Sequence, residues 1–98
     1  MTVLDPAAGR ELRKTRPCVI ISPAALHDFL PTCIVAPMTT DSRPAPYRVP
    51  VAFDGRKGFI LLDQIRTLDQ LRLLKRLGKV NSKTIGATLA TLQELFAP

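Results

Sequence analysis

Short apolar runs separated by prolines and polar loops follow one another along most of the chain. Residues 17–22 (PCVIIS) and 32–36 (TCIVA) are rich in β-branched and apolar side chains, and each run stops at a proline, Pro23 or Pro37. This pattern is typical of buried strands. Residues 47–53 (YRVPVAF) alternate instead, which predicts a strand with one buried face. That face would carry Tyr47, Val49, Val51 and Phe53.

The second half of the chain predicts a hairpin, a further strand and a terminal helix. Residues 54–58 (DGRKG) contain the Asp-Gly pair that favours a tight hairpin turn, and residues 59–68 (FILLDQIRTL) follow as a strand. Residues 69–80 are compatible with either a helical turn or a short strand. Asn81 and Ser82 are suitable helix N-caps. Apolar residues then recur at the spacing of one helical face, at Ile85, Leu89, Leu92 and Phe96.

This order of elements predicts a mainly β protein with a C-terminal α-helix. Short strands joined by tight loops favour a small, strongly curved antiparallel sheet or partial barrel. Residues 4–16 hold Pro, Gly and four basic side chains without a period, which indicates a loop. A length of 98 residues predicts one domain over residues 1–98, with a core modest enough for a partner chain to help stabilise it.

Charge and cysteine content narrow the class of protein. The chain has 14 Lys and Arg against 8 Asp and Glu, a net charge of +6, which fits either a nucleic-acid partner or a generally basic surface. Cys18 and Cys33 each lie in an apolar run and are interpreted as small buried side chains, although a disulfide between neighbouring strands stays open. The longest apolar run, residues 59–62, is too short to span a bilayer, and no signal peptide is visible. We therefore expect a soluble cytoplasmic protein.

Four motifs in a fixed order then resemble a known family. They are Glu11 with Lys14-Thr15-Arg16-Pro17, Val35-Ala36-Pro37-Met38-Thr39-Thr40, Leu61-Leu62-Asp63-Gln64-Ile65-Arg66-Thr67-Leu68-Asp69, and Arg72-Leu73 with Lys75-Arg76-Leu77-Gly78. Together they resemble the MazF/PemK toxin endoribonucleases of type II toxin–antitoxin systems, over nearly the whole chain. The resemblance implies the small SH3-like barrel shared by CcdB, MazF and PemK toxins.

The resemblance also implies an activity and its partners. It implies a homodimeric, sequence-selective endoribonuclease (an mRNA interferase) that cleaves single-stranded RNA by attack of the 2′-hydroxyl on the adjacent phosphate, without metal or another cofactor. It further implies a cognate antitoxin whose acidic tail occupies the RNA groove. Two alternatives stay open at this point. One is a non-catalytic barrel toxin that binds a protein such as gyrase, and the other is a degenerate member that only binds antitoxin.

The reaction needs a base, a cation for the charge on the phosphate, and a proton donor. With His27 as the only histidine, which is interpreted as a surface residue, a two-histidine mechanism is excluded. By family match Arg16 is the main catalytic residue, since its planar guanidinium suits phosphate oxygens, although it could be an ordinary solvent-facing arginine. Thr39 matches the family's catalytic threonine, or could satisfy its own turn. Glu11 could be the base or an exposed carboxylate.

Further matched residues are expected to contact RNA. Lys14 precedes the catalytic arginine, Thr40 follows the catalytic threonine, and Gln64 and Arg66 lie in the third motif. Asp63 is expected to support the structure by pairing with a basic side chain, with a role at the RNA site as well.

The chain departs from the family at its beginning. Members usually have a full strand before the Asp-Pro loop, whereas only residues 1–4 precede Asp5 here. The first strand is therefore expected to be shortened or missing.

Overall fold

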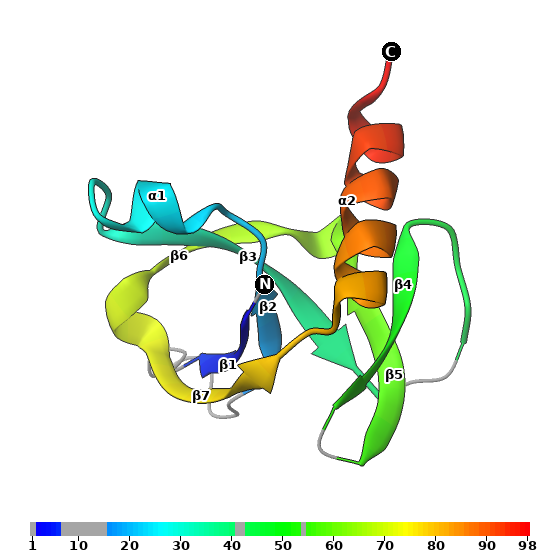
Figure 1. Cartoon of the computed structure of the whole chain (residues 1–98), viewed down its shortest axis with the longest axis horizontal. Helices are drawn as coiled ribbons and strands as arrows, with labels where there is room; N and C mark the ends of the chain where they lie inside the picture. The colour runs from blue at the N-terminus through cyan, green and yellow to red at the C-terminus, as the bar shows by residue number, and fades with distance from the viewer. Residues whose placement is uncertain (1, 7–15, 41–42, 54) are drawn as a thin grey trace.

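The computed structural model describes residues 2–6, 16–40, 43–53 and 55–98. Among these residues a strongly curled antiparallel sheet lies against one long helix (Figure 1). The elements, in chain order, are β1 Thr2–Pro6, β2 Cys18–Ile20, α1 Ala24–His27, β3 Thr32–Thr39, β4 Arg48–Phe53, β5 Arg56–Leu61, the 3₁₀ turn η1 Leu62–Gln64, β6 Arg66–Asp69, the 3₁₀ turn η2 Gln70–Arg72, β7 Leu73–Lys79 and α2 Ser82–Phe96.

The strands are ordered β4-β5-β3-β2-β1-β7, and β6 pairs with β3 beside this path. Every recorded strand pair is antiparallel. The predicted class, mainly β with a strongly curved sheet and a C-terminal helix, is confirmed. No helix in the described part of the chain has the length and apolar character needed to cross a membrane.

The start of the chain differs from the predicted loop. Residues 4–6, assigned to a loop, belong to β1, so a first strand is present. Val3 pairs with Val19 of β2 on one side and with Gly78 of β7 on the other. Because both neighbouring strands offer unpaired backbone groups to this segment, hydrogen bonding from two sides fixes a strand whose own sequence signal is weak.

The strand β3 runs past Pro37, where the prediction had it stop. It pairs with β6 and β2 over its first part and changes to β5 at Met38 and Thr39. Pro37 lies opposite Cys18 at this change of partner, and the amide of Met38 donates to the Pro17 carbonyl at 3.0 Å. A missing amide donor is tolerated at such an irregular position.

The single strand predicted for residues 59–68 is interrupted by η1. Both halves pair with β3, with Ile60 opposite Met38 and Arg66 opposite Val35. Five residues lie between Ile60 and Arg66, but only two lie between Val35 and Met38. The surplus cannot be paired, so it forms the 3₁₀ turn, as an enlarged bulge would.

The ambiguous segment 69–80 contains a short 3₁₀ turn and then a strand, so the strand alternative holds from Leu73 onward. The Asp69 side chain accepts a hydrogen bond from the amide of Leu71 at 2.9 Å, which holds the turn η2. This turn connects the end of β6 to the start of β7.

The helix α2 begins where predicted, but its buried face is rotated. The Asn81 side chain accepts from the amide of Thr84 at 2.8 Å, which confirms the N-cap. Thr88 is fully buried, and Ile85 and Leu92 pack against the core, whereas Leu89 and Phe96 are exposed. Thr88 can occupy the core because its hydroxyl donates to the Thr84 carbonyl, which satisfies the polar atom.

The core consists of two clusters on the two faces of the curled sheet. The larger cluster, beneath α2, contains Val19, Ala36, Met38, Val49, Val51, Ile60, Leu62 and Val80. The smaller cluster contains Cys18, Cys33, Val35 and Leu68. Both cysteines are buried, as predicted, and the two do not form a disulfide with each other. Phe53 packs on the larger cluster, but Tyr47 is exposed, because its backbone is left-handed (φ 62°) and breaks the alternation.

A candidate phosphate-binding cleft

A polar cleft of about 390 Å³ lies where the start of β2, the end of β3, the β4–β5 hairpin and β7 meet. Among the described residues, two arginines, two threonines and four apolar residues line it. Its lining residues are Arg16, Pro17, Met38, Thr39, Thr40, Phe53, Arg56 and Leu77. Three residues predicted for the site, Arg16, Thr39 and Thr40, therefore lie in one cleft, although Arg16 is far from the two threonines in the sequence.

Arg16 is exposed at the cleft and is held there by the strand that follows it. The hydrogen bond from Met38 to the Pro17 carbonyl joins the residue after Arg16 to the residue before Thr39. Pro17 itself restricts the backbone of Arg16 to extended conformations. The backbone of Arg16 is thereby fixed beside the threonines, while the donors of its guanidinium stay accessible to a ligand.

Thr39 and Thr40 occupy the end of β3, where β5 approaches very closely. Thr39 pairs with Phe59, and the neighbouring Gly58 is buried. A Cβ at Gly58 would overlap the Thr39 carbonyl oxygen and would lie 3.2 Å from the Thr40 Cα. The absence of a side chain at Gly58 therefore permits the strand contact that fixes both threonines.

Arg56 is a cleft residue that the sequence prediction missed. It is the first residue of β5 and pairs with Phe53 across the hairpin turn, in which Gly55 has the left-handed φ of 71°. Phe53 and Arg56 line the cleft together. The Asp-Gly turn signal already made these two residues neighbours, but only the packing of the hairpin beside Arg16 shows that they face the cleft.

The other predicted residues lie elsewhere or outside the described residues. Asp63 and Gln64 are exposed on η1, and Arg66 is exposed on β6, opposite Val35. Val35 is four residues from Thr39 along β3, so Arg66 is about 13 Å from the cleft threonine at strand spacing. None of these three residues lines the cleft. Glu11 and Lys14 fall within the part of the chain that the structure does not describe.

Asp63 pairs with a basic residue, as its structural interpretation predicts. Its Oδ1 lies 3.6 Å from Nε of Arg48, and the two side chains are 40% and 24% exposed. Nε of Arg48 is buried and has no hydrogen-bond partner, so this contact is an ion pair without a hydrogen bond. At this exposure it contributes at most about 1 kcal/mol to stability.

Nearly the whole chain, including the residues of the cleft, matches a known family. Residues 1–96 match the family described as PemK-like, MazF-like toxins of type II toxin–antitoxin systems. The chain belongs to this toxin family.

Several curated MazF/PemK relatives show the extent of the match. The chain is 32% identical over 96 residues to the endoribonuclease EndoA of Bacillus subtilis, which covers 92% of the chain and 83% of EndoA. It is 34% identical over 99 aligned residues to the Escherichia coli endoribonuclease PemK, covering 95% of the chain and 74% of PemK. The match to the E. coli K12 endoribonuclease toxin MazF is 33% identical over 64 residues, covers 65% of the chain, and spans 58% of that toxin.

Solved MazF structures share the fold. A mycobacterial endoribonuclease, determined in complex with its cognate antitoxin, has a TM-score of 0.85 at 24% identity, with 99% of this chain and 93% of that chain covered. The Mycobacterium tuberculosis toxin MazF-mt6 has a TM-score of 0.83 at 21% identity, with 98% and 96% covered. The predicted MazF/PemK fold is therefore confirmed.

His27 is outside the cleft of this MazF/PemK family member. Its Nε2 lies 2.8 Å from Oγ of Ser22, and its carbonyl accepts a hydrogen bond from the side chain of Gln70. It is half-buried and joins α1 to its neighbours through these contacts. Within the described residues, no group of three or more His, Cys, Asp or Glu side chains could hold a metal ion.

Proposed function

We propose that this chain is a metal-independent toxin endoribonuclease that cleaves single-stranded RNA at selected sequences. The observation that carries the proposal is the cleft itself, which Arg16 and Arg56 line together with Thr39 and Thr40. Two cations beside two hydroxyls can hold a phosphodiester and stabilise the extra negative charge of its transition state. The relatives MazF, EndoA and PemK, which are named endoribonucleases, support this reading.

In the proposed reaction the ribose 2′-hydroxyl attacks the adjacent phosphorus. The new 2′-O–P bond forms as the P–O5′ bond breaks, which leaves a 2′,3′-cyclic phosphate and a 5′-hydroxyl. Glu11 is the proposed acceptor of the 2′-hydroxyl proton. In this proposal Arg16 stabilises the pentacoordinate phosphate and protonates the leaving oxygen, while Thr39 donates to a phosphate oxygen.

RNA contacts outside the reacting phosphate are proposed for Lys14, Thr40, Asp63, Gln64 and Arg66. Thr40 lies in the cleft. The exposed residues Asp63, Gln64 and Arg66 lie outside it, so they would contact RNA only where the strand extends beyond the cleft.

The partners follow from the same family. A homodimer, with the RNA lying in a groove across it, and a cognate antitoxin that neutralises the activity are both part of the proposal. A related mycobacterial endoribonuclease was solved with its cognate antitoxin, which supports the second partner. An RNA substrate of this kind would place the reaction in the cytoplasm.

The test is cleavage of a long single-stranded RNA by the purified full chain in EDTA, with Arg16→Ala, Arg16→Lys and Lys79→Ala beside it. Lys79 is an exposed cation on β7 outside the cleft lining, so its loss controls for net charge. We expect discrete fragments from the wild type and from Lys79→Ala, and none from Arg16→Ala. Arg16→Lys should cleave RNA much more slowly, since an ammonium group cannot form the bidentate hydrogen bonds of a guanidinium to a phosphate.

Two further results decide the chemistry. A substrate with a 2′-deoxy nucleotide at the mapped cleavage position should stay intact, because the nucleophile is missing. Intact RNA with folded wild-type protein would refute the endoribonuclease proposal, as would equal cleavage by Arg16→Ala.

A further inference from the structure

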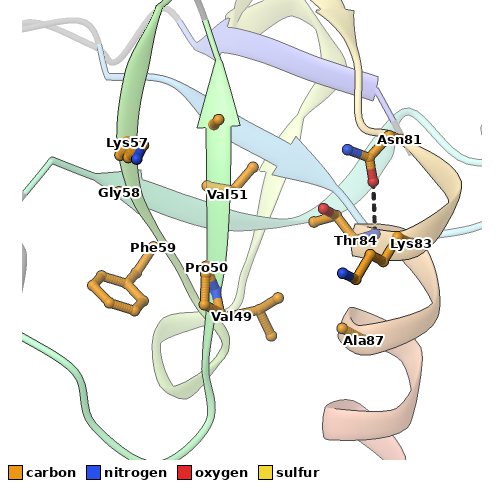
Figure 2. A pocket seen from close by; sticks show the side chains of 11 residues that line it. Val49, Pro50, Val51, Lys57, Gly58, Phe59, Asn81, Lys83, Thr84 and Ala87 are labelled. Atoms are coloured by element: carbon orange, nitrogen blue, oxygen red, sulfur yellow. Dashed lines mark hydrogen bonds between the residues drawn. The ribbon is translucent and has the colours of Figure 1, made fainter.

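The face of the β4–β5 hairpin that packs beneath α2 continues into the cleft. Val49 and Val51 point from β4 toward the helix, whereas Phe59 of β5 points away from it (Figure 2). Side chains two residues apart on a strand share a face, so Phe53 continues the face of Val49 and Val51. Its cross-strand partner Arg56 lies on the same face, and both residues line the cleft. The hairpin therefore brings an aromatic residue and an arginine, directly opposite each other, to the cleft.

Two apolar side chains of the cleft are accessible to a ligand. Phe53 packs on the larger core cluster but is only half-buried. Leu77 of β7 is 39% exposed and lies outside both core clusters. Both residues line the cleft that the arginines and threonines also line. Apolar surface inside a polar cleft is where an apolar group of a ligand would gain most by leaving water.

The cleft therefore offers two kinds of contact. Arg16, Thr39 and Thr40 suit phosphate oxygens, and Phe53 and Leu77 suit a flat apolar group. A nucleotide combines both, since its anionic phosphate is joined through the ribose to a base with two stacking faces. A volume of about 390 Å³ is near the lower end of the range for small-ligand sites, which fits one nucleotide better than a longer stretch of RNA.

We propose that Phe53 and Leu77 bind one of the two nucleobases that adjoin the cleaved phosphodiester. The face of that base stacks on the ring of Phe53, and Leu77 covers a further part of it. The inference rests on the proposed endoribonuclease function, because it names the part of the RNA that the same cleft binds. It assigns both residues to substrate binding and gives neither of them a proton transfer.

The composition of the cleft favours recognition of the face of the base over its edge. No Asp, Glu, Asn or Gln is among the described lining residues, so the amino groups of adenine, cytosine and guanine meet no carboxylate or amide side chain there. Stacking on an aromatic ring accepts every base, and its strength increases with the apolar area in contact. We therefore expect the site to accept any base and to bind a purine more strongly than a pyrimidine.

Other occupants match only part of the cleft. An apolar side chain of a protein would cover Phe53 and Leu77 but would bring no anion to Arg16 and Arg56. A free phosphate would contact the arginines and leave the two apolar side chains in water. A base attached to a phosphate satisfies both sides of the cleft at once.

The test compares cleavage of RNA substrates that differ only in one base. The cleavage site is mapped first, and each flanking nucleotide is then replaced in turn by a ribose without a base, which keeps the 2′-hydroxyl. On intact RNA we expect Phe53→Ala to lower kcat/KM by roughly tenfold, the scale of one lost stacking contact, and Leu77→Ala to lower it less. On one of the two abasic substrates the wild type should lose a similar factor, and neither substitution should lower its kcat/KM further.

Matched controls separate base binding from folding. Phe53→Leu keeps an apolar side chain on the core but lacks the flat ring, so it should stay folded and still lose activity toward intact RNA. An abasic site several nucleotides from the cleavage position should leave the effect of Phe53→Ala unchanged. A variant whose catalytic groups are merely displaced would lose the same factor on every substrate, because the loss would not depend on the base.

A binding measurement tests the same contact without catalysis. A short 2′-deoxy oligonucleotide that carries one 2-aminopurine cannot be cleaved by 2′-hydroxyl attack, and stacking on an aromatic ring quenches the fluorescence of this purine. We expect quenching by the wild type and little by Phe53→Ala, at protein concentrations where fluorescence anisotropy shows the oligonucleotide bound to both.

Equal losses of kcat/KM on the intact and on both abasic substrates would overturn the proposal, as would wild-type kcat/KM in the double variant Phe53→Ala, Leu77→Ala. With either result, an active chain keeps its endoribonuclease function and loses only the base site. An inactive wild-type chain that still quenches 2-aminopurine through Phe53 would remove the proposed function and leave the base site in place. An oligonucleotide that binds the wild type without quenching would overturn the base site whatever the activity.

Discussion

Replacing Gly58 by alanine should displace the end of β3 that carries Thr39 and Thr40. A Cβ at this buried position would overlap the Thr39 carbonyl oxygen, and it would lie only 2.9 Å from the carbonyl carbon and 3.2 Å from the Thr40 Cα. All three atoms belong to the backbone and cannot rotate away as the end of a flexible side chain could. The strands must therefore separate locally by on the order of 1 Å to restore van der Waals contact.

The size of the effect follows from that displacement. Overpacking of a buried site costs about 1–3 kcal/mol of stability. A shift of about 1 Å in a positioned catalytic group lowers the rate by on the order of a hundredfold. We expect Gly58→Ala to lose about this much in kcat, with a smaller change in KM, since the arginines of the cleft remain in place.

The assay is steady-state cleavage of a fluorogenic RNA, at a temperature where circular dichroism shows the variant to be folded, together with its thermal denaturation. Gly86→Ala is the matched control, because Gly86 is exposed on α2 and a Cβ there meets nothing within 4 Å. It should keep wild-type activity and gain roughly 0.5–1 kcal/mol from better helix propensity. A folded Gly58→Ala variant with wild-type kcat would refute the reasoning.

Three other predictions concern the cleft, the helix and the core. Arg56→Ala should lower kcat/KM and flatten the salt dependence of RNA binding by about one unit of slope, and equal losses in Lys57→Ala, on the other face of the hairpin, would contradict it. Asn81→Ala should lower the free energy of unfolding by about 1 kcal/mol in urea titrations, since the Thr84 amide loses its acceptor, and Asn81→Asp should not. Burial, with a smaller contribution from the Asp69 carboxylate, raises the pKa of the Cys33 thiol, so the unfolded chain ionises first. The associated stability should be complete below the unfolded thiol pKa of about 8.5 and be lost as the pH rises toward the folded pKa, and Cys33→Ala should remove this alkaline loss in pH-dependent denaturation.

Several local features could be predicted from the sequence because short-range chemistry decides them. The Asp-Gly pair supplies a turn with Gly55 at φ 71°, and Asn81 caps α2 through a residue three positions later. The apolar runs around Cys18 and Cys33 become buried strands. The four motifs in their fixed order, which include Arg16 and Thr39, indicated the family and, with it, the curved sheet.

Other features depended on distant partners and could not be predicted from local patterns. The strand β1 exists because β2 and β7 pair with it from both sides, and η1 exists because its segment is longer than the part of β3 that it pairs with. Tyr47 leaves the core because its backbone, and not its place in an alternating pattern, sets its direction.

The sequence by itself determined which residue types the site would use, and the tertiary structure decided which of them meet. Arg16 and Thr39 belong to recognisable motifs. Arg56 belongs to none and lines the cleft because of how the β4–β5 hairpin packs. Asp63 and Arg66, which belong to the third motif, lie outside the cleft. The reason is physical: a motif records which side chains are present, but their distance depends on how the strands pair, and that pairing is fixed by hydrogen bonds between residues far apart in the chain.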